Sequence, residues 1–334
     1  MTKLIIQIPC LNEASTLPAT LRDLPTRIPG IDQIEALVID DGSTDDTSGV
    51  ARSCGVNHIV RFPANKGLAA AFMTGLDAAL KLGADVIVNT DADNQYAGQD
   101  ISTLVQPILR READIVIGDR NVRTIRHMPW LKRWLQLFGS WVVRQVSNTR
   151  VPDTTSGFRA YSREAALRQT IVSDFSYTLE SIIQAGKNRM AIAHVPVATN
   201  ENTRASRLFD NIFTYIKKSA TTIVRIYTMY EPLKVFTITG GTVFLTGFVI
   251  SLRFLFLYLG DHGQGNIQSL ILSAVLMIVG FQVILIGLVA DAIASSRKLT
   301  EELLYRLRSI ELSTFAEKSH ARDAIDEPIE VGKP

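Results

Sequence analysis

Short apolar runs alternate with longer mixed segments along the first 120 residues of the chain. The apolar runs have the length of buried strands and lie at 4–9, 36–40, 58–61, 86–90 and 115–118. Between them, apolar residues recur with the spacing of an amphipathic helix over 17–24, 45–54, 67–82 and 101–110. Because parallel strands need crossover helices of this kind, the alternation predicts an α/β fold with a mostly parallel, Rossmann-like sheet.

Two much longer apolar runs, 236–258 and 267–290, lie in the last third of the chain, and only Arg253 interrupts the first. Each is long enough to cross a membrane as a helix. Residues 260–266 between them contain no Lys or Arg, whereas basic residues flank the pair on both sides: Lys217, Lys218, Arg225, Lys234, Arg297, Lys298, Arg306 and Arg308. The positive-inside rule therefore predicts a two-pass hairpin with the sheet domain in the cytoplasm.

Two further segments, 130–146 and 208–230, mix aromatic and aliphatic residues with basic ones. Such helices pack into the core of a soluble protein but lie at the interface of a membrane protein, and the hairpin downstream favours the second interpretation. The polar tail after Ser313 is expected to fray. The predicted organisation is a cytoplasmic sheet domain over 1–207, interface helices over 208–234, the membrane hairpin over 235–295, and a cytoplasmic C-terminal helix and tail over 296–334.

The composition excludes several classes of protein. With 35 Lys and Arg against 33 Asp and Glu, and 46% hydrophobic residues, the chain is neither disordered nor a basic nucleic-acid binder. The first nine residues contain no long apolar stretch before a small-residue cleavage site, so we expect no signal peptide. In the reducing cytoplasm, Cys10 and Cys54 are expected to be buried thiols rather than a redox pair.

Acidic residues directly follow two of the predicted strands: Asp40 and Asp41 after the second, and Asp91 and Asp93 after the fourth. Parallel sheets bind ligands beyond the carboxyl ends of their strands. Two carboxylates at this spacing suit Mg²⁺ or Mn²⁺, which neutralise the charge of a diphosphate leaving group. Acidic pairs are also common in ordinary turns, so the position at a strand end is what favours a metal site. Neither a Gly-x-Gly-x-x-Gly string nor a Gly-Lys-Ser/Thr loop occurs.

Six motifs between residues 4 and 208 occur in the order seen in glycosyltransferase family 2: Pro9-Cys10-Leu11-Asn12-Glu13, Asp40-Asp41-Gly42-Ser43-Thr44-Asp45, Asn65-Lys66-Gly67, Asp91-Ala92-Asp93-Asn94-Gln95, Gly118-Asp119-Arg120 and Asp153-Thr154-Thr155-Ser156-Gly157-Phe158-Arg159. The sequence resembles the polyisoprenyl-phosphate glycosyltransferases of that family. It is similar to bacterial undecaprenyl-phosphate glucosyltransferases, whose two-helix C-terminal anchor the hairpin matches, and to dolichol-phosphate mannose synthase.

The resemblance implies a GT-A fold and a set of site residues. The implied donor-nucleotide site comprises Pro9, Leu11, Glu13, Asp40, Asp41, Lys66, Asp91, Ala92 and Arg120. Mg²⁺ or Mn²⁺ would be held by Asp91, Asp93 and Gln95, and the implied catalytic residues are Asp93 and Asp153. The implied acceptor-phosphate site comprises Arg133, Arg204, Ser206 and Arg207. Leu11 replaces the Tyr found in many relatives, and the Arg204 segment departs from their R-x-x-G-x-S-K pattern.

The role of Asp153 stays open at this point. The second pKa of a phosphomonoester lies near 6, so a lipid phosphate is already largely dianionic at neutral pH and needs little help from a base. Asp153 could orient the acceptor, take up the last proton, support the metal or cap a turn. Arg204 and Arg207 could bind a lipid phosphate in bidentate fashion or simply supply positive-inside charge.

These expectations favour a metal-dependent, inverting glycosyltransferase in the inner (cytoplasmic) membrane, inversion being implied by the family alone. It would transfer a sugar, with glucose from UDP-glucose expected, to undecaprenyl or another polyprenyl phosphate for cell-envelope glycans such as O-antigen. A processive polysaccharide synthase is the alternative, but the chain has no Q-x-x-R-W string and only one hairpin. A non-catalytic scaffold would be expected to lose some of the motif's aspartates. A homo-oligomer, and a tetramer among the options, is also expected.

Overall fold

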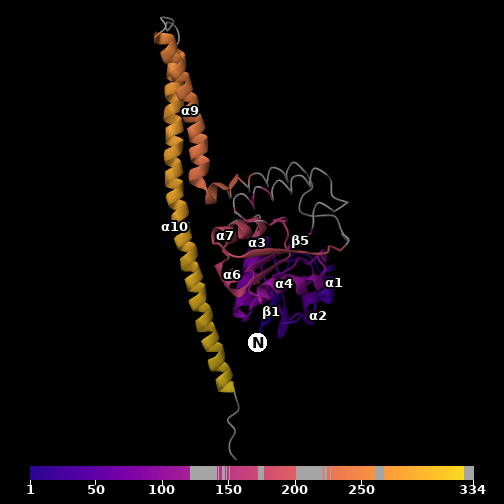
Figure 1. Cartoon of the computed structure of the whole chain (residues 1–334). Helices are drawn as coiled ribbons and strands as arrows, with labels where there is room; N and C mark the ends of the chain where they lie inside the picture. The colour runs from indigo at the N-terminus through magenta and orange to yellow at the C-terminus, as the bar shows by residue number, and fades with distance from the viewer. Residues whose placement is uncertain are drawn as a thin grey trace, which may run out of the picture. The chain divides into compact units, whose positions relative to one another are not determined.

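A computed structural model (Figure 1) describes residues 1–120, 151–171, 177–200, 227–259 and 267–326, with single residues between 141 and 149 and between 221 and 225. The chain forms two compact units. One comprises Met1–Ser219 with Glu302–Pro334, and the other is Ala220–Glu301. The first contains the sheet and the second contains most of the length of the two apolar helices.

Seven strands form one mixed sheet in the order β3-β2-β1-β4-β6-β5-β7. The pairs β1/β2, β2/β3, β1/β4 and β5/β7 are parallel, and only β6 runs antiparallel to its neighbours β4 and β5. The predicted α/β fold with a mostly parallel sheet is confirmed. The strands are β1 (Lys3–Cys10), β2 (Gln33–Asp40), β3 (His58–Arg61), β4 (Val86–Asn89), β5 (Ile115–Asp119), β6 (Arg159–Ser162) and β7 (Ile192–Pro196).

The helices of this unit cover both faces of the sheet (Figure 1). They are α1 (Leu17–Asp23), α2 (Thr47–Ser53), α3 (Leu68–Lys81), η1 (Gly98–Asp100), α4 (Ile101–Leu109), α6 (Arg163–Arg168) and α7 (Tyr177–Lys187). The five strands and four helices expected before residue 120 are confirmed to within three residues at each end. β6 and β7 lie after residue 120, where the sequence pattern predicted no strands.

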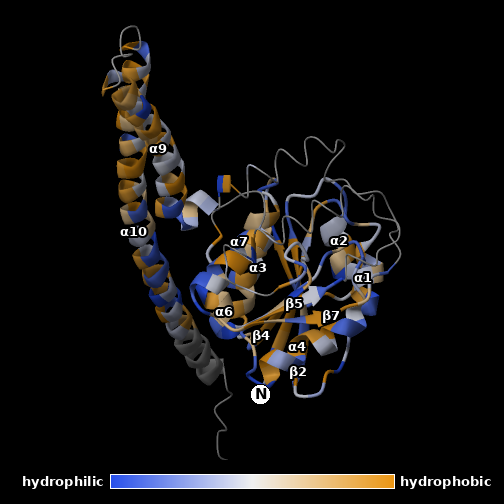
Figure 2. Cartoon of the chain, turned by 45° about the horizontal axis from the view of Figure 1, so that its top comes forward, coloured by the Kyte–Doolittle hydropathy of each residue, from blue (hydrophilic) through white to orange (hydrophobic). Residues whose placement is uncertain are grey.

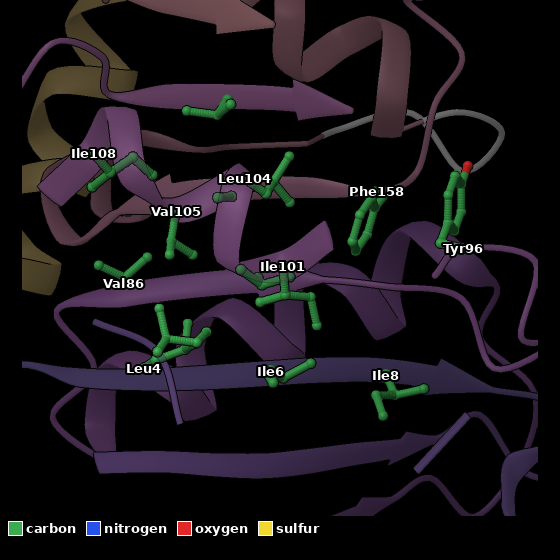
Figure 3. Close-up of a cluster of buried hydrophobic side chains, with 14 of the residues drawn as sticks. Leu4, Ile6, Ile8, Val86, Tyr96, Ile101, Leu104, Val105, Ile108 and Phe158 are labelled. Carbon is green, nitrogen blue, oxygen red and sulfur yellow. The ribbon is translucent and has the colours of Figure 1, made fainter. Parts of the chain in front are cut away.

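One face of β1 packs into a hydrophobic core. Figure 3 shows Leu4, Ile6 and Ile8 packed with Val86 and with Ile101, Leu104, Val105 and Ile108 of α4, and all of them are buried. At the strand ends, the rings of Tyr96 and Phe158 stack with their centroids 4.9 Å apart. The core thus extends to the edge of the sheet that carries the acidic turns. Cys10 is buried as expected, but Cys54 after α2 is exposed, so that part of the expectation is wrong.

The second unit contains α9 (Pro232–Leu259) and most of α10 (Ile267–Asp326). Both are long and apolar enough to cross a membrane, with mean hydropathies of 1.9 and 2.6, and their apolar windows are only 6% and 17% buried. A core helix of a soluble protein would be mostly buried. α10 changes from hydrophobic to hydrophilic along its length (Figure 2) and continues without a break to Asp326. The sequence pattern instead predicts a separate helix from residue 296 and a frayed tail after Ser313.

Glycines bring α9 and α10 into backbone contact. A Cβ atom added at Gly240 would lie 2.6 Å from the carbonyl oxygen of Gly280, and one at Gly247 would lie 2.8 Å from that of Ser273. Further along, a Cβ at Gly287 would lie 2.6 Å from the Cβ of Phe236. Small residues at these positions permit the close helix packing that is common in membranes.

We expect Gly240→Ala to destabilise the hairpin and Gly241→Ala to leave it intact. The added methyl group at residue 240 meets backbone atoms that cannot move aside, whereas a Cβ at Gly241 has no atom within 4 Å. Overpacking of this kind costs about 1–3 kcal/mol. Thermal unfolding in detergent, followed by the protein that survives gel filtration, should show a lower midpoint for the first variant only. Equal midpoints would contradict the helix contact.

Within the first unit, the C-terminal part of α10 is fastened to α6. The guanidinium group of Arg308 donates to the carbonyl oxygens of Leu167 and Gln169 at 3.3 and 2.6 Å, and that of Arg168 lies 4.1 Å from the ring centroid of Tyr305. Two leucines of this segment are exposed, Leu303 at 60% and Leu307 at 61%, whereas Leu312 is buried. The homo-oligomer expected from these apolar residues stays a prediction.

Candidate active site

The loops that follow β1, β2 and β4 meet at one edge of the sheet. These strands are parallel neighbours, and the residues paired near their ends are Cys10 with Asp40 and Gln7 with Asn89. The predicted acidic turns therefore lie side by side where open α/β sheets bind ligands. Four other predicted donor-site residues lie at this edge, of which the first three are buried and the last is 39% exposed: Pro9, Glu13, Ala92 and Leu11.

Asp40 is completely buried and ionised. Its carboxylate accepts hydrogen bonds from the backbone N–H of Ser43 at 2.8 Å and from the hydroxyl of Ser48, and Nε of Arg61 lies 3.5 Å away. Burial opposes ionisation, but these hydrogen bonds and the Arg61 charge outweigh it and hold the pKa of Asp40 below its usual value. Asp40 thus fixes the loop after β2.

Asp41 and Asn12 hold two adjoining loops. Asp41 accepts hydrogen bonds from the backbone N–H groups of Lys66 at 2.7 Å and Gly67 at 3.0 Å, at the start of α3. The side-chain oxygen of Asn12 accepts from the backbone and hydroxyl of Thr44, at 2.8 and 3.1 Å. Asn12 has a φ of 56°, a left-handed conformation that Asn tolerates better than most residues. These bonds join three loops into one frame for a ligand.

Asp91 and Asp93 lie in the turn between β4 and η1, together with Gln95. Burial, followed by the charge of Asp93, raises the pKa of Asp91 to about 7, while Arg120 opposes the shift. Asp93 accepts a hydrogen bond from the backbone N–H of Gln95 at 3.1 Å. The buried side-chain oxygen of Asn94, between them, has no donor in the part of the chain that the structure describes.

This set of groups fits a divalent cation. Two carboxylates repel each other in a partly buried site, and a cation would relieve that repulsion. No group of three or more His, Cys, Asp and Glu side chains that could hold a metal occurs among the residues described. Two carboxylates and an amide leave positions for water or phosphate oxygens, which is how proteins usually bind Mg²⁺.

Arg120, after β5, forms a bidentate ion pair with Asp153. Its Nε and Nη2 atoms lie 2.7 and 3.1 Å from the two carboxylate oxygens, and Nη2 also donates to the Thr155 hydroxyl at 2.9 Å. Thr155 donates its backbone N–H and hydroxyl to Asp153 at 3.2 and 2.9 Å. Asp153 is 2% exposed, and burial opposes its ionisation, but Arg120 and Thr155 hold its pKa below the usual value. Asp153 is therefore a carboxylate with four hydrogen bonds.

Gly157 joins the Asp153 loop to the Asp91 turn. A Cβ at this position would lie 3.1 Å from both carboxylate oxygens of Asp91. The Gly157 N–H donates to the Tyr96 hydroxyl at 3.2 Å, and its carbonyl accepts from Asn89 Nδ2 at 2.8 Å. Asn89 is held in turn by Gln7 at 2.9 Å. Both polar atoms of the glycine backbone are thus fixed beside Asp91.

Sequence reasoning missed the buried polar residues around this loop: Gln7, Asn89, Tyr96, Arg159 and Tyr177. A signal for two of them was present, because Gln7 and Asn89 interrupt the apolar runs of β1 and β4. A polar side chain in a buried strand must find a hydrogen-bond partner.

The four predicted acceptor-phosphate residues lie outside the described residues: Arg133, Arg204, Ser206 and Arg207. Most of the predicted interface helix 130–146 and much of 208–230 also lie outside them.

Comparison with known proteins agrees with this architecture. The sequence model of Glycosyl transferase family 2 matches residues 5–168, and that of the GtrB C-terminal hairpin matches residues 231–296. UDP-N-acetylglucosamine–dolichyl-phosphate N-acetylglucosaminyltransferase of Methanococcus voltae is 30% identical over 58% of this chain and 83% of its own. Polyprenol monophosphomannose synthase of Mycolicibacterium smegmatis is 29% identical over 59% and 77%.

The chain therefore belongs to glycosyltransferase family 2, and the resemblance to its polyisoprenyl-phosphate branch is confirmed. Its fold is also that of glucosyl-3-phosphoglycerate synthase from Mycobacterium tuberculosis, solved in complex with Mn²⁺, UDP-glucose and phosphoglyceric acid. That structure is 20% identical, covers 68% of this chain and 80% of its own, and has a TM-score of 0.52. The GT-A fold expected for the sheet domain is thus confirmed.

Proposed function

We propose that the protein transfers glucose from UDP-glucose to undecaprenyl or a similar polyprenyl phosphate, at the cytoplasmic face of the membrane and with Mg²⁺ or Mn²⁺. The two candidate membrane helices and the hairpin family support a two-pass anchor. The observation that carries the proposal is that the Asp91–Asp93 turn and the Arg120–Asp153 ion pair lie at the same edge of the sheet. The Asp91–Asp93 turn suits a metal-bound diphosphate, and the adjoining loop presents the Arg120–Asp153 pair.

In the proposed reaction, an oxygen of the lipid phosphate attacks C1 of the sugar. A bond forms between C1 and that oxygen, the bond from C1 to the diphosphate breaks, and UDP leaves with the electron pair. Attack from the face opposite the diphosphate gives inversion. A dianionic phosphate has no proton to lose, so the step needs no strong base. Asp91, Asp93 and Gln95 would hold the cation, which neutralises the departing diphosphate when bound.

The chain's own residues do the remaining work. Asp40, Asp41 and Asn12 keep the loops of the donor site in one frame. Asp153 holds Arg120 in a fixed direction. The Arg120 charge is proposed to act on the diphosphate of the donor. Arg133, Arg204, Ser206 and Arg207 are proposed to bind the lipid phosphate, in keeping with the bidentate preference of Arg for phosphate.

The test uses the full-length protein in detergent with undecaprenyl phosphate and a panel of labelled donors: UDP-glucose, UDP-N-acetylglucosamine and GDP-mannose. We expect a lipid-linked product from UDP-glucose that is lost when the divalent cation is chelated and restored when it is added back. Product from another donor only would correct the sugar and keep the reaction class. No lipid-linked product from any donor would overturn the proposal.

A further inference from the structure

Arg159, at the start of β6, is a completely buried arginine that none of the predicted roles uses. Its guanidinium group reaches the Asp153 loop from inside the protein. Nε donates to the carbonyl oxygen of Ser156 at 2.7 Å, and Nη2 donates to that of Thr154 at 2.9 Å. One planar group thus holds two carbonyl oxygens on either side of Thr155.

The other end of the same guanidinium group is attached to α7. Nη1 donates to the carbonyl oxygen of Thr178 at 2.9 Å and to the hydroxyl of Ser181 at 2.6 Å. Ser181 is itself buried and lies within α7. Arg159 therefore connects the loop to α7 and to β6.

A buried arginine is stable only if its N–H groups are hydrogen-bonded, as these four bonds achieve. Burying a charged group without hydrogen bonds is strongly unfavourable, and an apolar side chain at this position would leave the carbonyl oxygens of Thr154, Ser156 and Thr178 without these donors. Only arginine offers several donors in a fixed planar fork, whereas lysine carries its charge on a single rotating ammonium group. The arrangement thus specifies loop geometry in a way that packing alone does not require.

The geometry of the Asp153–Gly157 loop matters because its two ends contact Arg120 and Asp91, two residues of the candidate site. Asp153, at one end, holds Arg120, and Gly157, at the other, lies against the carboxylate of Asp91. We propose that Arg159 is a positioning residue that keeps the Arg120–Asp153 pair and the Asp91 turn at one fixed separation. The inference rests on the proposed function, because transfer to a phosphate acceptor requires both groups at once.

The test compares Arg159→Lys with Arg163→Lys. Arg163 lies four residues further along and also donates to a backbone carbonyl, that of Ala84 at 3.1 Å, but it is remote from the loop. Two activities are measured with the same donor: transfer to polyprenyl phosphate and the slow hydrolysis of the donor by water. We expect Arg159→Lys to lower kcat for transfer about 10- to 100-fold and hydrolysis by a clearly smaller factor, with the donor KM nearly unchanged, because misaligned reactants lose rate rather than affinity. Arg163→Lys should match the wild type.

Hydrogen exchange supplies a readout that does not depend on activity. In Arg159→Lys the amides of residues 153–157 should exchange faster, while those of β1 and β4 stay protected. If this variant does not fold, Ser181→Ala removes only one anchor and should show the same changes at smaller size. Wild-type exchange in the loop, or an equal loss of transfer and hydrolysis with a lower melting temperature, would overturn the positioning role. Absence of lipid-linked product from the wild type would reject the proposed function alone.

Discussion

Asp91→Asn and Asp93→Asn should each reduce sugar transfer by about 1,000-fold, equivalent to ~4 kcal/mol of transition-state stabilisation. The two carboxylates are the charged members of the candidate metal site, and Asp91 already bears the cost of burial beside Asp93. Removing either charge weakens binding of the cation, which would offset the charge that develops on the diphosphate. Initial rates at saturating Mn²⁺ and donor, with labelled product extracted into organic solvent, provide the measurement.

A binding measurement separates loss of the cation from general damage. Mn²⁺ at about 100 times its Kd should stabilise the wild-type protein by ~2.7 kcal/mol, seen as a rise in melting temperature. Neither variant should show this rise. Asp77→Asn is the control, because Asp77 is exposed on α3 and pairs only with Lys81 among the described residues. A full Mn²⁺-induced rise in an inactive variant would place the cation elsewhere.

Much of this fold follows from local patterns in the sequence. Four of the first five strands, β1, β2, β4 and β5, carry apolar runs that are mostly buried, so each run marks a strand without reference to the rest of the chain. The ends of these runs also predict that Asp40, Asp41, Asp91 and Asp93 lie at one edge of the sheet. The apolar segments of α9 and α10 are longer than a core helix needs, so their length and hydropathy alone predict membrane helices.

The second half of the site depends on contacts between distant segments. The Arg120–Asp153 pair joins positions 33 residues apart, and Asn89 reaches Gly157 across 68 residues. Neither separation leaves a local pattern. Arg159 is missed for a different reason: sequence reasoning assigns a charged residue to the surface by default, and its burial is evident only once the carbonyl oxygens that satisfy it are in place.

The Arg120–Asp153 ion pair makes a contribution to stability that depends on pH. Because the folded pKa of Asp153 lies below that of the unfolded chain, the contribution of the pair is fully present above the ordinary carboxyl pKa of about 3.9. It is lost as the pH falls through the folded pKa. Asp153 therefore remains a carboxylate throughout the neutral range and does not titrate there.

Asp153→Asn should reduce transfer by about 100-fold, and by the same factor on both sides of the acceptor's second pKa near 6. Asn cannot form the bidentate ion pair, so Arg120 loses its fixed direction at every pH. The measurement is kcat against pH for the wild type and the variant. Asp114→Asn serves as the control, since the Asp114 side chain only accepts a backbone N–H of Ala191 at 2.9 Å among the described residues.

A base would behave differently from a residue that orients Arg120. Below the second pKa the lipid phosphate carries a proton, and a base would be needed to remove it; above that pKa no proton is left. If Asp153 were the base, the defect of Asp153→Asn would be large in acid and would disappear as the pH rises. Such a profile would contradict the orienting role, whereas a constant defect, matched by Arg120→Gln and not deepened in the double variant, would establish that the pair acts as one unit.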